Sequence, residues 1–230
     1  KVKKVIKQAI DQLVDHKLAL PAMSAWLSVH NDSQLTTLEF TSARGTIRMA
    51  APAQAVVAIA AARINEQSLS EFLQQQIKPL LPEHVDKLVI SLRPEATTGF
   101  YYHYSHGLKK HDGNCQRIDH GHRSTIQIFD NGMLSPRLGK YWCERWEDIY
   151  LATAEDQIEA SALRYLKAEA GALNFAYSSA QGYFEISLPA TTCEVVPCDT
   201  TVECLADFIA KSIKESHQLN AVKVIAFEGV

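Results

Sequence analysis

The chain has 230 residues, of which 47% are hydrophobic and 21% charged, and its formal net charge at pH 7 is −3. This composition fits an ordinary globular protein with room for one large or two small cores, whereas the absence of excess positive charge excludes a basic surface for nucleic acid. No apolar run approaches the roughly 18 residues that a membrane span needs, and five cysteines without paired C-x-x-C spacing favour a reduced, cytoplasmic setting.

The first half of the chain mixes helical and extended patterns. Apolar residues at helical spacing predict an amphipathic helix from the start of the chain to about residue 16. A second helix is predicted at 68–80, with Ser68 as its N-cap and Pro82 just beyond its end. Strands are predicted where β-branched residues and alternation dominate, at 25–30, 35–41, 46–50 and 88–92.

The second half contains more strands. Extended patterns predict strands at 99–106, 123–129, 141–150 and 221–227, with a hairpin at 175–188 around Gly182. Helices are predicted at 156–167 and 202–213. Turn residues occur at 113–114 and 130–132.

A histidine cluster lies in this half. Side chains alternate along a strand, so His120 and His122, on either side of Gly121, should point to the same face. His106 can approach from the neighbouring strand, and three neutral imidazoles with a fourth position open are the usual catalytic zinc arrangement. Copper or iron would fit similar ligands, and an isolated H-x-H is often only a pair of surface imidazoles. The cluster is dense, with five of the nine histidines within 20 residues: His103, His106, His111, His120 and His122.

Two further sites carry candidate proton-transfer groups. Cys115 lies in the loop before His120 and offers a thiol as nucleophile or acid–base group. Asp15 and His16 end the first predicted helix, where a carboxylate beside an imidazole would fix its tautomer and raise its basicity. The alternative for His16 is a positive charge that stabilises the helix C-terminus.

Parts of the sequence repeat. Three pairs of blocks recur in the same order at offsets of 137, 136 and 135 residues: 40–47 with 177–184, 70–73 with 206–209, and 88–92 with 223–227. Nearly constant spacing over three blocks indicates a tandem duplication. We therefore predict two units, at 1–97 and 98–230.

These motifs resemble those of the 6-pyruvoyltetrahydropterin and 6-carboxytetrahydropterin synthases, which share the T-fold. The family carries F-x-A-A-H on one strand, C-x-x-x-H-G-H on the next and L-D-H-x-x-L at the end of its first helix. Residues 102–106 (YHYSH), 115–122 (CQRIDHGH) and 13–18 (LVDHKL) look like these three elements. Four residues separate Cys115 from His120, where the family has three. The resemblance implies an α+β fold of two tandem T-fold units, each an antiparallel sheet with helices packed on one face.

The resemblance also implies a function. It is that of a zinc-dependent carbon–oxygen lyase that converts dihydroneopterin triphosphate to a 6-substituted tetrahydropterin, with the 6-carboxy product for queuosine synthesis as one candidate. A glutamate at the end of the last strand anchors the pterin in the family, and Glu228 stands at that position. The implied roles are zinc ligation by His106, His120 and His122, proton transfer by Cys115 and His16, orientation of His16 by Asp15, and pterin binding by Glu228.

The first unit lacks the opening hairpin of a T-fold, so we expect the native chain to extend upstream of Lys1. T-folds complete barrels by association, which implies a homo-oligomer. The alternative function is a degenerate T-fold that binds pterin or purine ligands, or serves as an assembly partner, without catalysis. A zinc hydrolase is disfavoured, since no glutamate adjoins the His pair as a general base.

Overall fold

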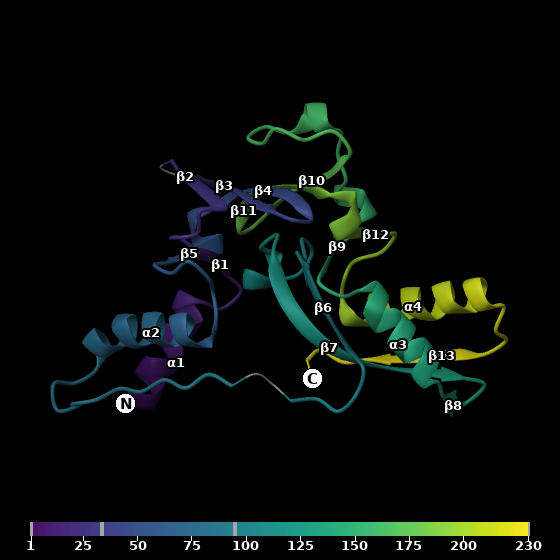
Figure 1. The fold of residues 1–230 in the computed structure, drawn as a ribbon, viewed down its shortest axis with the longest axis horizontal. Coiled ribbons are helices and arrows are strands. Elements are labelled where there is room, and N and C mark those ends of the chain that lie inside the picture. The colour runs from purple at the N-terminus through teal and green to yellow at the C-terminus, as the bar shows by residue number, and fades with distance from the viewer. Residues whose placement is uncertain (1, 33–34, 94–95, 230) are drawn as a thin grey trace.

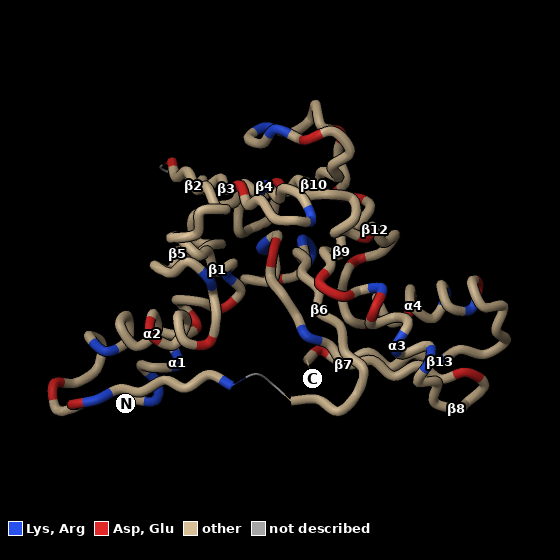
Figure 2. The backbone as a smooth tube through the Cα atoms, viewed as in Figure 1, with Lys and Arg blue, Asp and Glu red and all other residues tan. Residues whose placement is uncertain are grey.

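A computed structural model describes residues 2–32, 35–93 and 96–229 (Figure 1). Lys1, where the expected upstream extension would join, lies outside these ranges. The fold is α+β, as predicted: two lobes with helices flank a central hairpin, and a five-stranded sheet crosses above them. Acidic and basic residues are interspersed along the chain (Figure 2). No helix in the described part of the chain is long and apolar enough to span a membrane.

The first half contains two helices and five strands within the described ranges, and the predicted strands at 25–30, 35–41 and 46–50 are confirmed with small shifts of their ends. In chain order the elements are α1 (Val2–Leu13), β1 (Leu18–Pro21), β2 (Leu27–Asn31), β3 (Leu35–Ser42), β4 (Gly45–Pro52), β5 (Val56–Ile59) and α2 (Glu66–Ile77). Short 3₁₀ turns follow β4 and α2, at Ala53–Ala55 and Lys78–Leu80.

The second half carries the histidine hairpin. Its elements are β6 (Tyr101–His106), β7 (His120–Asp130), β8 (Met133–Leu134), α3 (Pro136–Arg145), β9 (Ile149–Thr153), β10 (Ala172–Ser179), β11 (Gly182–Pro189), β12 (Cys193–Val196), α4 (Val202–His217) and β13 (Val222–Ala226). The hairpin at 175–188, the helix from 202 and the strand at 221–227 are confirmed.

The central sheet has the order β12-β9-β6-β7-β13, with β8 beside β7. Helices α3 and α4 pack on one face of this sheet, where Tyr102, Trp142, Trp146 and Ile209 are among the fully buried side chains. Burial of so much aromatic surface stabilises the lobe and fixes the strand register. In that register His106 lies opposite His120, and Tyr104 lies opposite His122.

The second sheet joins the two halves of the chain in the order β10-β11-β4-β3-β2, with β4 and β11 antiparallel. A Cβ atom on Gly45 would lie 2.6 Å from Pro189 Cγ, and one on Gly182 would lie 2.5 Å from Pro52 Cγ. Both glycines have positive φ angles, 114° and 123°, so their lack of a side chain serves both the turn and the close approach. The two contacts are related by the same offset of 137 residues as the sequence blocks.

The prediction of a strand at 141–150 is wrong for residues 141–145, which belong to helix α3, and strand β9 begins only at Ile149. Pro136 occupies the first turn, where its missing N–H costs no hydrogen bond. Leu138, Trp142 and Trp146 follow at intervals of four residues and are fully buried against the central sheet. The aromatic content of the stretch favoured a strand, but packing of this helical stripe decides the structure.

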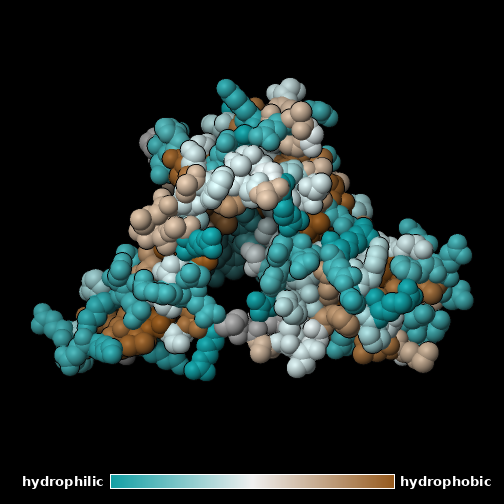
Figure 3. Space-filling view, in the orientation of Figure 1, coloured by the Kyte–Doolittle hydropathy of each residue, from teal (hydrophilic) through white to brown (hydrophobic). Residues whose placement is uncertain are grey.

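Two other local predictions need correction. Residues 88–92 pair with no strand in the described part of the chain, whereas their counterpart β13 pairs with β7. Helices α1 and α2 pack against each other around Ala9, Leu73 and Ile77, and apolar side chains remain at their surface (Figure 3). Helix α2 also begins earlier than predicted, because Asn65 is its N-cap and Ser68 reciprocates in a capping box.

The predicted helix at 156–167 is replaced by a loop with 3₁₀ turns at Ala154–Asp156 and Ala160–Ala162. The fully buried carboxylate of Glu185 accepts hydrogen bonds from the backbone N–H groups of Arg164 (2.6 Å), Tyr165 (3.0 Å) and Leu166 (3.2 Å). It also accepts one from the Tyr183 hydroxyl at 2.7 Å. In a helix these N–H groups would bond carbonyls four residues earlier, so the carboxylate selects the loop.

Glu185→Gln is expected to lower the free energy of unfolding by about 2–3 kcal/mol, since an amide NH₂ would face N–H groups that need an acceptor. Urea unfolding followed by circular dichroism measures this change. The control is Glu169→Gln in the same loop, whose half-exposed carboxylate pairs with Arg48 at 2.8 Å and should contribute at most about 1 kcal/mol. Equal effects of the two substitutions would contradict the assignment.

Candidate active site

The three predicted histidine ligands converge. His106 ends β6, while His120 and His122 begin β7. The ring centroids lie 4.6 Å apart for His106 and His120, 5.0 Å for His106 and His122, and 5.2 Å for His120 and His122. One ring nitrogen from each residue lies within 4.8 Å of the others, which is close enough for one metal ion to bridge them.

The ring orientations also suit a metal ion. His106 Nδ1 lies 2.9 Å from Thr200 Oγ1, and His120 Nδ1 lies 3.2 Å from the carbonyl oxygen of Arg117. The Nε2 atoms of both rings are buried and find no hydrogen-bond partner among the described residues. Metal-binding histidines are commonly held in this way, with one nitrogen on an outer partner and the other free for the ion. The donor set therefore fits a metal ion.

The electrostatic environment keeps these imidazoles neutral. Burial lowers the pKa of His106, and its histidine neighbours lower it further. Burial lowers the pKa of His120 to about 3. The pKa of His122 is also lowered by burial, although the nearby Glu228 carboxylate opposes this effect. A neutral imidazole is the form that ligates metals, so the site is prepared for an ion at neutral pH.

These shifts predict a pH dependence for the metal-free protein. Above pH 6.5, the ordinary histidine pKa, folded and unfolded chains both hold His120 neutral. Between pH 6.5 and about 3 only the unfolded chain takes up the proton, so stability should fall as the pH falls through this window. Urea unfolding at pH 7 and pH 5 with a chelator present measures the loss. His120→Gln should show a smaller loss; an unchanged one would contradict the prediction.

The predicted proton-transfer groups lie beside the histidines, in the same chain. Cys115 Sγ is 3.3 Å from His16 Nε2, and His16 Nδ1 is 3.0 Å from Asp15 Oδ2. The rings of His16 and His120 have centroids 5.0 Å apart. The extra residue in the loop thus leaves the thiol within reach of His16. His16, Cys115 and His120 form a second group of side chains that could hold a metal ion.

The environment of Cys115 favours the protonated thiol. Burial raises its pKa, and the carboxylates of Glu228 and Asp15 raise it further. A thiol that keeps its proton at neutral pH can donate it to a group in contact with it. Together with His16 this gives the site a proton donor and a proton acceptor 3.3 Å apart.

Glu228 lies just beyond β13, where the chain still runs beside β7. The Phe227 N–H donates to the Thr125 carbonyl at 3.0 Å, and the Thr125 N–H donates to the Gly229 carbonyl at 3.0 Å. The Glu228 side chain is exposed, and its charge acts on Tyr104, Cys115 and His122. A carboxylate is therefore held at the rim of the site and is open to a ligand.

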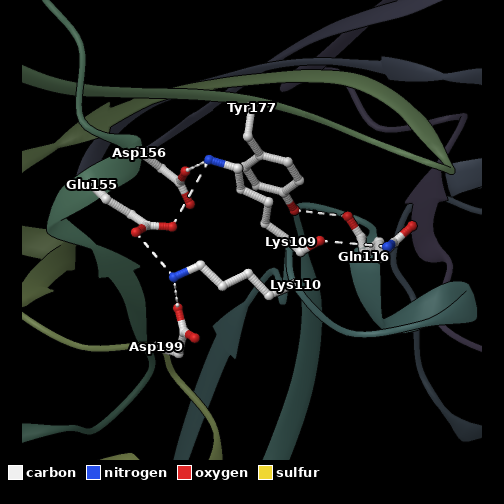
Figure 4. Close-up of polar contacts among 7 residues, drawn as sticks. All are labelled: Lys109, Lys110, Gln116, Glu155, Asp156, Tyr177 and Asp199. Atoms are coloured by element: carbon white, nitrogen blue, oxygen red, sulfur yellow. Dashed lines mark hydrogen bonds and ion pairs between the residues drawn. The ribbon is translucent and has the colours of Figure 1, made fainter.

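Ion pairs and hydrogen bonds hold the loop between β6 and β7 in place (Figure 4). Lys109 pairs with Asp156 at 2.9 Å, and Lys110 pairs with Glu155 at 3.0 Å and Asp199 at 3.1 Å. These lysines hold carboxylates of their own chain, so they stabilise the loop that carries Cys115.

Two buried tyrosines hold the same loop, and sequence reasoning did not find them. The Tyr177 hydroxyl donates to the Gln116 carbonyl at 2.8 Å, and the Tyr150 hydroxyl donates to the Ile118 carbonyl at 2.8 Å. Thr200 and Arg117, which hold the rings of His106 and His120, were missed in the same way. All but the Thr200 contact involve a backbone carbonyl, which has no signature in the sequence.

Comparison with known proteins gives one family. The family model of 6-pyruvoyl tetrahydropterin synthase matches residues 95–229. The solved structures that resemble this chain include 6-pyruvoyl tetrahydropterin synthase from Plasmodium falciparum, with 13% identity and a TM-score of 0.40 over 56% of this chain and 86% of that one. A catalytic-residue mutant of the Plasmodium vivax enzyme has 14% identity and a TM-score of 0.38 over the same shares. No curated protein matches the sequence.

Proposed function

The chain belongs to the 6-pyruvoyl tetrahydropterin synthase family, and from this premise we propose that it is a zinc-dependent pterin synthase of the carbon–oxygen lyase type. Its substrate would be dihydroneopterin triphosphate, and its product a 6-substituted tetrahydropterin. One observation carries the proposal: the histidine triad and the Asp15–His16–Cys115 group lie side by side, with His16 and His120 in ring contact. The first group suits a metal ion, and the second suits proton transfer.

Zinc is the proposed ion because three imidazoles with an open fourth position are its usual catalytic ligands. His106, His120 and His122 would hold it. When bound, zinc supplies Lewis-acid polarisation of the oxygens on the substrate side chain, which acidifies the neighbouring C–H groups.

The proton steps fall to residues of this chain. His16 Nε2 would accept a proton from the substrate carbon, while Asp15, whose Oδ2 lies 3.0 Å from Nδ1, would orient the ring. Cys115 Sγ, whose raised pKa favours the protonated thiol and which lies 3.3 Å from His16 Nε2, would shuttle protons together with His16. Loss of the triphosphate group then completes the elimination.

Glu228 would anchor the pterin ring. A carboxylate can accept two parallel hydrogen bonds from the ring N–H and the amino group of a pterin. Its exposed position, with its charge acting on Cys115 and His122, supports this role. The 6-carboxy product, used in queuosine synthesis, is our preferred candidate among the 6-substituted products.

We keep the organisation into two tandem T-fold units, 1–97 and 98–230, as part of the proposal. The reciprocal glycine–proline contacts between β4 and β11 support it. So does the parallel pair in each half, β1 with β5 and β9 with β12. Assembly into a homo-oligomer, which would close the sheets into a barrel, belongs to the same proposal.

The test is turnover of dihydroneopterin triphosphate by zinc-loaded and chelator-treated protein, with released triphosphate quantified and the pterin product identified by mass spectrometry. We expect zinc-dependent release of one triphosphate per pterin consumed. Zinc-loaded protein that binds the pterin but releases no triphosphate would overturn the lyase assignment. That outcome would support a non-catalytic pterin-binding T-fold instead.

A further inference from the structure

Arg117 connects the two groups of the site. Its side chain is only 6% exposed, although it belongs to the loop between Cys115 and His120. The guanidinium Nη1 donates to the carbonyl of Asp15 at 2.9 Å and to the carbonyl of His16 at 3.1 Å. These acceptors lie about a hundred residues away in the sequence, beyond the last turn of α1.

The same residue also acts on the histidine triad through its backbone. The Arg117 carbonyl lies 3.2 Å from His120 Nδ1, the contact that leaves Nε2 of this ring free. The Arg117 N–H in turn donates to the Asn114 carbonyl at 3.1 Å, which closes the turn that carries Cys115. Arg117 therefore contacts the His120 ring, the turn that carries Cys115, and the backbone of Asp15 and His16.

The backbone at His16 needs such support. Its φ angle is 50°, in the left-handed region that residues with a side chain rarely occupy. A conformation of this kind is strained and persists where surrounding contacts hold it. A cation at the end of α1 is also favourable, because the last carbonyls of a helix carry partial negative charge.

We propose that Arg117 is the positioning residue that holds His16 against Cys115. Its two hydrogen bonds fix the Asp15–His16 carbonyls, and with them the left-handed turn that aims the His16 ring at the thiol. It touches no reacting atom in this scheme and acts through His16. The inference rests on the proposed function for its effect on turnover, but its structural part stands without it.

The test uses Arg117→Met, which keeps much of the side-chain volume and removes both hydrogen bonds. Hydrogen exchange, measured by mass spectrometry on the peptide covering residues 13–18, should become faster. The zinc content should remain near that of the parent, since the carbonyl that supports His120 belongs to the backbone. Turnover should fall about 100-fold in kcat, with KM changed little, because a shift of about 1 Å in a catalytic group has this effect.

Two variants make the experiment specific. Arg117→Lys restores a donor and the charge, so it should recover part of the lost kcat. Arg145→Met is the control, because Arg145 likewise makes two side-chain hydrogen bonds, at 3.0 and 2.7 Å, both to Glu194 on β12, although its side chain is more exposed than that of Arg117. It should destabilise the fold without changing exchange at 13–18 or lowering kcat selectively.

The outcomes separate this inference from the proposed function. Unchanged exchange at 13–18 in Arg117→Met overturns it, whether or not the parent protein turns over the pterin. Loss of zinc in that variant also overturns it, since Arg117 would then support the metal centre itself. If the parent shows no turnover while the variant exchanges faster and retains zinc, the positioning role stands and the lyase assignment fails.

Discussion

Replacing His106 with alanine is expected to reduce the zinc content of the purified protein from about one ion per chain to nearly none. The ring is buried, its Nδ1 is held by Thr200, and its Nε2 points at the other two ligands without a protein partner in the described ranges. Removing it leaves two imidazoles, which hold zinc weakly. The loss should exceed the roughly 10- to 100-fold that removal of an outer partner costs. Elemental analysis by mass spectrometry measures it.

The control is His103→Ala. His103 lies on the same strand, but on the opposite face, where its ring contacts Asp148 and Arg123. Its loss should leave the zinc content unchanged. Because His106 is buried and its replacement could disturb folding, the half-buried His122→Ala serves as a second test. A parent protein without zinc, purified without chelators, would contradict the metal centre, as would equal zinc in all variants.

Replacing either Cys115 or His16 with alanine is expected to lower kcat by about 100- to 10,000-fold, the usual contribution of general acid–base groups. Zinc should remain, since neither residue belongs to the triad of His106, His120 and His122. The two side chains are 3.3 Å apart and would act in one proton-transfer system. The double variant should therefore lose little more than the worse single variant.

The comparison is steady-state kinetics of both single variants, the double variant and Cys143→Ala. Cys143 is a partly buried free thiol that packs with the core around α3 and contacts none of the proposed site residues. Its replacement should leave kcat nearly unchanged. Additive losses in the double variant would show that Cys115 and His16 act independently and would refute the paired mechanism. Loss of zinc in His16→Ala would instead assign His16 to the metal.

Local periodicity determined much of this protein. Alternation along a strand places His120 and His122 on one face, and the structure has them there. Gly45 and Gly182 mark the hairpin turns, and the apolar stripe from 202 gives α4, capped by Thr201. These features depend on neighbours within a few residues, so the sequence contains the information needed to predict them.

Other elements were decided by distant contacts. The stretch at 141–150 has the composition of a strand, yet its first half forms the end of α3, which buries Trp142 and, at the helix C-cap, Trp146. The stretch at 156–167 has helical character. Its backbone N–H groups nevertheless donate to the Glu185 carboxylate, which stabilises a loop instead of a helix. In each case tertiary burial or a buried charge outweighs the small energies of local propensity.

For the candidate site, the sequence by itself predicted which side chains would carry the proposed chemistry: three imidazoles, a thiol, an imidazole next to a carboxylate, and a terminal glutamate. Only the tertiary structure decided that Asp15 and His16 meet Cys115 within one chain. It also decided that Arg117 joins them to His120. The physical reason is that these contacts depend on packing between elements about a hundred residues apart and on backbone carbonyls. Every residue has a backbone carbonyl, so no sequence pattern shows which carbonyl will make such a contact.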